Sequence, residues 1–282
     1  MNEKQQKITL EFLSLSDYEE LKEAMIASYK NMPDSYWRER QINNLLNKFP
    51  KGQVVIKVNG KIAGCALSII VDSQKFDDQH TYKEITGNYT FNTHNEDGDV
   101  LYGIDIFIKP EYRGLRLGRR LYEYRKELCE NLDLRAIFMG GRIPNYHLHA
   151  NEMTPKEYIQ KVRTHEIHDP VLNYQISNDF HPVRIIKGYL EGDEASGEYA
   201  VLLRWDNIYY EKPTKKAKTI KKIVRIGIVQ WQMRPYEDLD NLMRQAEYFI
   251  DTLSGYRCDF ALFPEFFNAP LMAKYNHLKK NS

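Results

Sequence analysis

The first 208 residues alternate between two patterns of apolar and polar positions, one with the period of a strand and one with the period of a helix. Strands are predicted at 8–15, 53–58, 61–70, 100–109, 134–140, 183–189 and 199–205. Helices are predicted after residue 17, over about 35–49, from about 117 and from 154, and a polar segment at 73–97 is predicted to be a loop. This order predicts a mixed α/β domain that ends near residue 208.

Local residue choices support several of these boundaries. Asn59-Gly60 separates two strand patterns, and this pair suits the positive φ angles of a type I′ hairpin turn. Ser16-Asp17 and Thr154-Pro155 are predicted helix starts, each with a capping side chain at or before the first turn. The helix from about 117 is predicted to bury one apolar stripe, formed by Leu117, Leu121, Tyr124 and Leu128.

A second, shorter pattern follows after a break in composition. Segment 212–222 holds six lysines and no acidic residue, which favours a solvated linker over a nucleic-acid or membrane patch. Beyond it, a strand at 225–230, an amphipathic helix at 239–253 and a strand at 259–265 are predicted. The domains are therefore predicted as 1–208, a linker at 209–222, and 223–282.

Composition and charge exclude some classes of function. Forty basic and thirty-nine acidic residues leave a net charge of +1, so no global field favours nucleic acid or a membrane surface. No secretory signal and no membrane span is visible. Three widely spaced cysteines (Cys65, Cys129 and Cys258) fit reduced, buried thiols, so a cytoplasmic location is expected.

The segment after Pro110 carries the most informative pattern in the first domain. A strand ends at this proline, and Arg113 to Gly118 then forms the start of a helix, where free backbone N–H groups and the dipole favour an anion. Gly114 and Gly118 let the backbone approach a bulky pyrophosphate closely. Additional positive charge comes from Arg113, Arg116, Arg119 and Arg120.

This segment resembles the coenzyme A loop of the GNAT N-acetyltransferases, which reads Arg/Gln-x-x-Gly-x-Gly/Ala. Arg113 matches the first position and Gly118 the last, whereas Arg116 stands where the family usually has glycine. The resemblance covers residues 8–208 and implies a GNAT fold, whose splayed mixed sheet holds acetyl-CoA between two parting strands. It implies that coenzyme A contacts Ile106, Phe107, Ile108, Arg113, Gly114, Leu115, Arg116, Leu117, Gly118 and Arg119.

The resemblance also implies direct attack by an amine, either a small molecule or a lysine, on the acetyl thioester. An alkylammonium with a pKa near ~10.4 must first lose a proton, so a base is useful, and the leaving thiolate needs an acid. Asp105 is the candidate base, on the strand face opposite Ile104, Ile106 and Ile108, although a solvated sheet face would explain it equally. Tyr174 is the candidate acid and Tyr146 its rival. The acceptor pocket is expected from loops 73–97 and 144–168.

Near the end of the sequence, Pro264-Glu265-Phe266-Phe267 closes the second pattern. With the strand and helix before it, this run resembles the start of a nitrilase-type carbon–nitrogen hydrolase, in which Glu265 would be the general base. That family also needs a Lys and a Cys nucleophile from later in its chain, and this sequence stops at Ser282. We therefore expect an incomplete α-β-β-α unit, inactive alone, at the front of a longer protein. The whole chain resembles bacterial proteins that fuse the two modules.

Two functions remain open at this stage. The first is an acetyl-CoA-dependent N-acetyltransferase; the second is a non-catalytic acyl-CoA-binding or delivery module that serves the hydrolase. No metal is expected, because His147, His149, His165 and His168 lack the cysteine pairs or the His-Glu-x-x-His helix of zinc sites. No nucleic-acid or membrane partner is expected, and self-association stays open.

Overall fold

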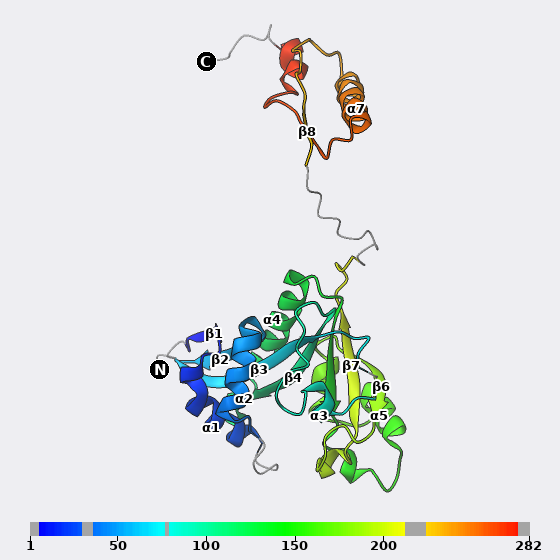
Figure 1. Cartoon of the computed structure of the whole chain (residues 1–282). Helices are drawn as coiled ribbons and strands as arrows, with labels where there is room; N and C mark the ends of the chain where they lie inside the picture. The colour runs from blue at the N-terminus through cyan, green and yellow to red at the C-terminus, as the bar shows by residue number, and fades with distance from the viewer. Residues whose placement is uncertain (1–5, 30–35, 77–78, 212–223, 276–282) are drawn as a thin grey trace, which may run out of the picture. The chain divides into compact units, whose positions relative to one another are not determined.

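The computed structural model describes residues 6–29, 36–76, 79–211 and 224–275. The chain divides into two compact units, 1–212 and 213–282. The strands of unit 1 are β1 (Ile8–Phe12), β2 (Gln53–Val58), β3 (Lys61–Val71), β4 (Val100–Ile108), β5 (Ala136–Arg142), β6 (His181–Ile186) and β7 (Ala200–Asp206). Its helices are α1 (Tyr18–Ser28), α2 (Glu39–Lys48), α3 (Tyr82–Ile85), α4 (Leu117–Asn131), α5 (Pro155–Arg163) and α6 (Leu172–Ile176) (Figure 1).

Among the described residues of unit 1, seven strands form one mixed sheet in the order β1-β2-β3-β4-β5-β7-β6. The β4–β5 pair is parallel, and the other neighbouring pairs are antiparallel. The predicted hairpin between β2 and β3 is confirmed, with φ angles of 53° at Asn59 and 80° at Gly60. The mixed α/β prediction is therefore confirmed for this unit.

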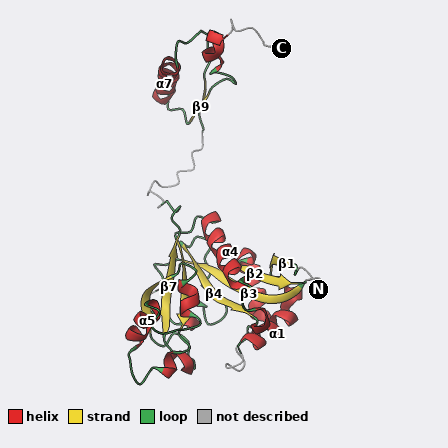
Figure 2. Ribbon diagram, turned by 180° about the vertical axis from the view of Figure 1, so that it is seen from behind, coloured by secondary structure: helices red, strands yellow, loops and turns green. Residues whose placement is uncertain are grey.

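Helices cover both faces of the sheet (Figures 1 and 2). On one face, Leu21 and Met25 of α1 and Ile42 of α2 belong to the same core cluster as Tyr102. On the other face, α4 and α5 pack with Leu101, whose side chain points away from that of Tyr102 because side chains alternate along a strand. The predicted apolar stripe of α4 is confirmed, since Leu117, Leu121 and Leu128 are buried and Tyr124 is partly buried.

Two details differ from the sequence-based expectations. Segment 73–97 is more than a polar loop, because it contains α3 and places Ile85 and Phe91 fully in the core. Asp17 is the residue before α1 as predicted, but its side chain accepts no capping hydrogen bond from that helix. A 3₁₀ turn, Leu15–Asp17, comes first, and the backbone N–H of Ser14 at its start donates to the Asp17 carboxylate at 3.0 Å. The Thr154 cap is confirmed, and its hydroxyl accepts from the Glu157 backbone N–H at 3.3 Å.

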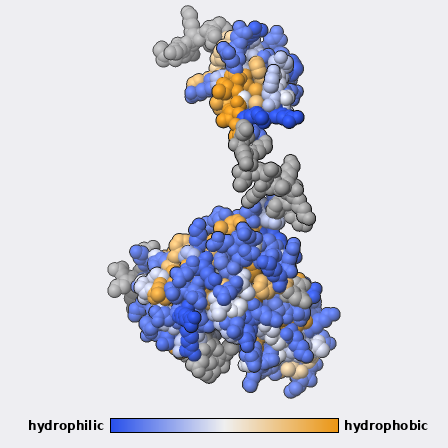
Figure 3. All heavy atoms as spheres, in the orientation of Figure 1, coloured by the Kyte–Doolittle hydropathy of each residue, from blue (hydrophilic) through white to orange (hydrophobic). Residues whose placement is uncertain are grey.

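Unit 2 contains β8 (Ile226–Ile228), α7 (Leu239–Gly255) and β9 (Phe260–Leu262), with β8 and β9 parallel. Its small core is built around Trp231, Leu242 and Ala246. The side chains on the strand face that points away from this core stay exposed. Figure 3 shows them as an apolar patch over the β8 part of this unit. The patch residues are Ile226, Ile228, Phe260 and Leu262, exposed by 56% to 75%. The predicted strand-helix-strand order is present, and the nitrilase-type identity of the unit stays a prediction.

Some expectations concern residues beyond these elements. The lysine-rich linker at 212–222 lies outside the described residues. In the described part of the chain, no helix is long and apolar enough to cross a membrane. Cys65 and Cys129 are buried free thiols as expected, whereas Cys258 is only half-buried.

Candidate functional site

The central feature of unit 1 is the point where β4 and β5 separate. Their parallel ladder joins Val100–Tyr102 to Ala136–Phe138 and ends there. From Gly103 on, β4 keeps its ladder to β3 and has no strand partner on its β5 side within the described residues. A cavity of about 470 Å³ lies at this separation, a size suited to a small-molecule substrate.

A β-bulge in β4 determines which side chains reach the cavity. The β3–β4 register shifts between Leu67, which faces Asp105, and Ser68, which faces Gly103, so Ile104 is the extra residue. Beyond the bulge, the side chains of β4 switch faces relative to the strand before it. Ile104 still lies on the sheet face that α1 and α2 cover (the α1–α2 face), whereas Ile106, two residues later, packs on the face that α4 covers (the α4 face).

Asp105 lies on the α1–α2 face, where its carboxylate contacts Tyr29 and Trp37. The prediction that Asp105 opposes Ile106 and Ile108 therefore holds, and the prediction that it opposes Ile104 is wrong. The bulge is the reason, because a strict period of two continues only through a regular strand.

Two hydrogen bonds from distant residues position the Asp105 carboxylate. The Tyr29 hydroxyl donates to Oδ1, and Trp37 Nε1 donates to Oδ2 at 3.1 Å. Burial deep in the cavity raises the pKa of Asp105, while the two donated hydrogen bonds and the nearby Arg125 oppose that rise. The side chain is thus a cavity carboxylate with a raised pKa, as a general base requires, and does not lie on a solvated sheet face.

Arg125, on the buried side of α4, reaches the same bulge. Its guanidinium donates to the Leu67 carbonyl at 2.7 Å, to the Asp105 carbonyl, and to the Ser68 hydroxyl at 3.1 Å. The Tyr82 hydroxyl donates to the carbonyl of Ile104 at 3.1 Å. These side chains satisfy backbone groups that the bulge takes out of the ladder.

The rest of the cavity wall is mostly aromatic and cationic. Arg142 forms a two-bond ion pair with the buried Asp193, with Nε 2.7 Å from Oδ2. Gln175 is 5% exposed, and its Oε1 has no hydrogen-bond partner within the described residues. Aromatic side chains on the wall are those of Tyr29, Tyr36, Trp37, Tyr82, Tyr89 and Tyr189.

The predicted coenzyme A loop connects β4 to α4. A 3₁₀ turn, Pro110–Tyr112, leads to Gly114 with φ of 88° and to Arg116 with φ of 56° as the residue before α4. Arg116 thus adopts the left-handed backbone conformation. Glycine reaches this conformation at little steric cost, which explains why it is usual at this position. No side chain caps the first turn of α4, so its N–H groups face outward together with the exposed Arg113 and Arg119.

The first turn of α4 is also where Tyr174 of α6 lies. A Cβ atom added to Gly118 would collide with the Tyr174 hydroxyl and would stand 3.1 Å from its Cζ. Tyr146, the alternative candidate acid, is only 6% exposed. Its hydroxyl donates to the Met153 carbonyl at 3.2 Å, and its ring packs against Tyr158 and Tyr199. The fold therefore brings Tyr174, rather than Tyr146, next to the predicted loop.

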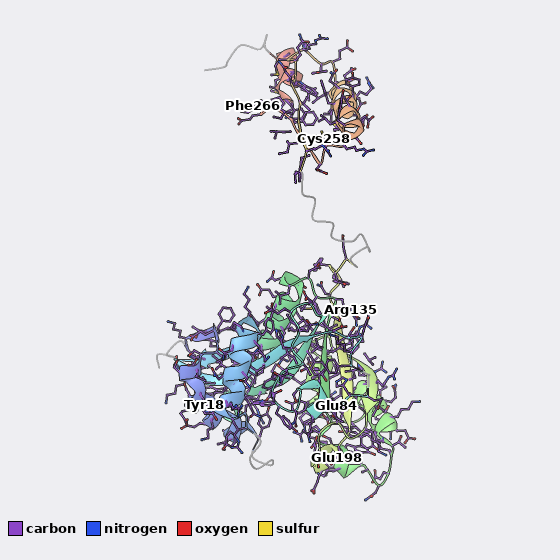
Figure 4. The ribbon with its side chains drawn as sticks, in the orientation of Figure 1. Tyr18, Glu84, Arg135, Glu198, Cys258 and Phe266 are labelled. Atoms are coloured by element: carbon purple, nitrogen blue, oxygen red, sulfur yellow. The ribbon has the colours of Figure 1, made fainter. Side chains whose placement is uncertain are left out.

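The remaining predicted residues divide into two groups. Ile106 lines the cavity, while Phe107 packs into the core below α1 and Ile108 packs towards α4. Glu265, in unit 2, is exposed after the end of β9, beside the exposed Phe266 labelled in Figure 4. Among the described residues, no group of three or more His, Cys, Asp or Glu side chains could hold a metal ion.

Several residues of the cavity were not predicted from the sequence. Loop 73–97 supplies Tyr82 and Tyr89 as expected, whereas no described residue of 144–168 lines the cavity. Tyr29 and, from 36–41, Tyr36, Trp37, Arg38 and Gln41 line it instead. Arg125 carried a usable signal, because it stands four residues after Leu121 and so lies on the apolar stripe of α4. Tyr29 and Trp37 carried none, because their contacts to Asp105 cross 76 and 68 residues of sequence.

Solved structures share the architecture of unit 1. The loading GNATL domain of CurA from Lyngbya majuscula superposes with a TM-score of 0.63 at 22% identity, covering 71% of this chain and 98% of that domain. The GphF GNAT-like decarboxylase in complex with isobutyryl-CoA gives 0.62 at 17% identity, covering 70% of this chain and 98% of the decarboxylase. At these identities the similarity establishes the fold.

Sequence relatives point to the same family. Residues 18–151 match the Acetyltransferase (GNAT) family. Probable hydrolase YhcX of Bacillus subtilis (strain 168) is 40% identical over 238 residues, which are 84% of this chain and 46% of that protein, so the chain spans about half of YhcX. Uncharacterized N-acetyltransferase YkwB of the same strain is 34% identical over 176 residues, 62% of this chain and 77% of YkwB. The fold, the loop before α4 and these relatives together show that the chain belongs to the GNAT family of acetyltransferases.

Proposed function

We propose that unit 1 transfers an acetyl group from acetyl-CoA to an amine by direct attack, with both substrates bound at once. The observation that carries this proposal is the Asp105 carboxylate in the cavity where β4 and β5 separate. The first turn of α4 would bind the pyrophosphate through its N–H groups and nearby arginines. The free edge of β4 beyond Tyr102 would pair with the amide groups of the pantetheine arm.

Each step of the reaction has a candidate group. The amine nitrogen attacks the carbonyl carbon of the thioester while Asp105 takes its proton, so a C–N bond forms. The C–S bond then breaks, and the thiolate takes up a proton. Tyr174 is the candidate donor; its hydroxyl lies against Gly118 and outside the cavity wall, so it would have to turn towards the sulfur to donate. Tyr174 is 38% exposed, and the partial burial of its ring raises the pKa of the phenol, which stays protonated at neutral pH and able to donate. The complex of GphF with isobutyryl-CoA supports an acyl-CoA donor for this fold.

The proposal is tested by turnover. The protein is incubated with acetyl-CoA and a panel of primary amines and lysine peptides; free CoA is followed with a thiol reagent and the acetylated product by mass spectrometry. Thiol release that depends on both an amine and Asp105 supports transfer. Gly118→Asp is the control for the loop, because it places a negative side chain against the first turn of α4 and should abolish CoA binding.

A second candidate is a module that binds acyl-CoA and serves a carbon–nitrogen hydrolase without transfer of its own. Its support is the match to Probable hydrolase YhcX, which covers more of this chain than the 212 residues of unit 1 and so continues into unit 2. In that function, Glu265 would be the general base of an amidase or nitrilase site completed by a lysine and a cysteine. Stoichiometric CoA binding without thiol release for any amine would favour this module over the transferase.

A further inference from the structure

Three buried side chains form a hydrogen-bonded chain that leaves the cavity where β4 and β5 separate. The Tyr189 hydroxyl lies 3.0 Å from the Tyr102 hydroxyl, which in turn lies 2.8 Å from Nε2 of His80. These residues are 4%, 2% and 7% exposed. Tyr102 is the last β4 residue of the parallel ladder, and Tyr189 lies so close to Gly140 of β5 that a Cβ atom there would collide with its hydroxyl.

The two ends of this chain belong to different cavities. Tyr189 lines the cavity that holds Asp105. Tyr102 and His80 line a second cavity of about 80 Å³, whose wall also includes Arg135. The Arg135 side chain is 31% exposed, so this second cavity lies close to the surface. The chain therefore leads from the candidate site towards the outside of unit 1.

The hydrogen bonds of this chain differ from those of the neighbouring wall tyrosines. Tyr29 donates to Asp105, and Tyr82 donates to a backbone carbonyl, which has no proton to transfer further. A hydroxyl both donates and accepts, and an imidazole exchanges protons near neutral pH. Burial raises the pKa of Tyr102 and of Tyr189, so each phenol stays protonated and gives up its proton only as it receives another.

The proposed reaction needs a second exit for protons. An alkylamine is a cation at neutral pH, and it loses two protons when it becomes an amide: one before the nitrogen can attack and one as the C–N bond forms. Among the described residues of the wall, Asp105 is the carboxylate, and it holds one proton at a time. While both substrates fill the cavity, the other proton has to leave through a different group.

We propose that Tyr189, Tyr102 and His80 relay this other proton from the acceptor nitrogen to the second cavity. The relay rests on the proposed function, because it needs an ammonium acceptor bound beside Asp105. Tyr189 accepts the proton from nitrogen and donates its own to Tyr102, and Tyr102 donates its own to Nε2 of His80. Both hydroxyls are restored in this step. His80 receives the proton in the tautomer that carries hydrogen on Nδ1, and the resulting imidazolium then loses a proton to water.

The test compares two acceptors that differ in charge and little in shape. The first is the most active alkylamine of the turnover panel; the second is its aminooxy analogue, in which oxygen replaces the CH₂ beside the nitrogen (O-ethylhydroxylamine for propylamine). The aminooxy analogue is neutral at neutral pH and has one proton to lose, which Asp105 takes. The value of kcat/KM is measured for both acceptors at neutral pH with saturating acetyl-CoA.

Tyr102→Phe removes the middle hydroxyl of the relay and keeps the ring, and Tyr102 does not line the cavity of Asp105. With the alkylamine, kcat/KM should fall about 10²-fold, the low end for a group that transfers protons. With the aminooxy analogue it should stay at the wild-type value. His80→Gln should show the same selective loss, because an amide can still hydrogen-bond to Tyr102 but does not take up a proton as an imidazole does.

Tyr158→Phe is the matched control for the loss of a buried hydroxyl. Tyr158 is fully buried, its hydroxyl donates to Asp169 at 2.8 Å, and neither residue lines either cavity. This variant should keep the wild-type ratio between the two acceptors.

The outcomes separate the relay from the proposed function. Equal losses with both acceptors in a folded Tyr102→Phe protein would make the role of this hydroxyl structural and overturn the relay, and so would the absence of any loss. The transferase stays intact in both cases, because the wild-type protein still transfers the acetyl group. No transfer from the wild-type protein to either acceptor would reject the proposed function and the relay with it.

Discussion

Tyr174 lies against Gly118 so closely that no side chain fits between the α6 phenol and the first turn of α4. The glycine that would allow a pyrophosphate to approach the backbone also allows this tyrosine to reach the predicted coenzyme A loop. One residue thus serves both the proposed binding of the cofactor and the position of the proposed acid.

Gly118→Ala should therefore impair the protein in two ways. The added Cβ atom displaces Tyr174, at a cost of about 1–3 kcal/mol in the free energy of unfolding. The affinity for CoA should fall with it, which calorimetry and denaturant unfolding measure. Gly255→Ala is the matched control, because no atom lies within 4 Å of its Cβ position apart from its chain neighbours and the backbone of its own helix. Wild-type affinity and stability in Gly118→Ala would show that Tyr174 moves aside at no cost.

Asp105→Asn should reduce turnover most near neutral pH. There the amine is protonated and depends on a base, so a loss of about 10²- to 10⁴-fold is expected. The loss should shrink at alkaline pH, where free amine is available without a base. Measured pH profiles of kcat/KM for both proteins check this. A loss that is equal at every pH would remove Asp105 from the role of base.

Tyr29→Phe should move the acid limb of the wild-type profile to higher pH. The base acts as a carboxylate, so activity falls as the pH drops through the pKa of Asp105, which burial already raises. The Tyr29 hydroxyl stabilises the carboxylate by donating to it, and its loss raises that pKa further. The pH profile of the variant measures the shift. If the acid limb stays in place or moves to lower pH, the loss of activity at low pH does not report the protonation of Asp105.

The two tyrosine candidates for the acid are distinguished by a pair of conservative variants. Tyr174→Phe should lower kcat by tenfold or more, within the range for a general acid, and should leave CoA affinity near the wild-type value. Tyr146→Phe should keep its activity and lose only about 0.5–1.5 kcal/mol of stability with the bond to Met153. Steady-state kinetics and thermal unfolding of both variants check this. The reverse pattern of activity would assign the acid to Tyr146.

Arg116→Gly should stabilise the loop and weaken ligand binding. The left-handed conformation at φ of 56° costs about 1–2 kcal/mol for a residue with a side chain, and glycine avoids most of that cost. The arginine charge beside the phosphates would be lost, so CoA affinity should fall, and more so at low salt. Denaturant unfolding and calorimetry at two ionic strengths measure both effects. Equal CoA affinity at low salt would show that Arg116 does not contact the phosphates.

The sequence by itself determined those features that depend on neighbouring residues. The hairpin at Asn59-Gly60, the helix start at Thr154 and the apolar stripe of α4 all follow from local conformational preferences and helix periodicity. The turn and helix start predicted to bind coenzyme A were visible for the same reason, because Pro110 and the residues before α4 form one continuous segment.

Only the tertiary structure decided the chemistry of the cavity. The bulge that turns Asp105 towards α1 is a mismatch between β3 and β4, and the period of a single strand carries no information about its partner. Tyr29, Trp37 and Arg125 meet at this bulge because their side chains satisfy buried groups of β4 across long sequence separations. Contacts of this kind are selected by burial and hydrogen bonding in the folded chain, and local patterns do not encode them.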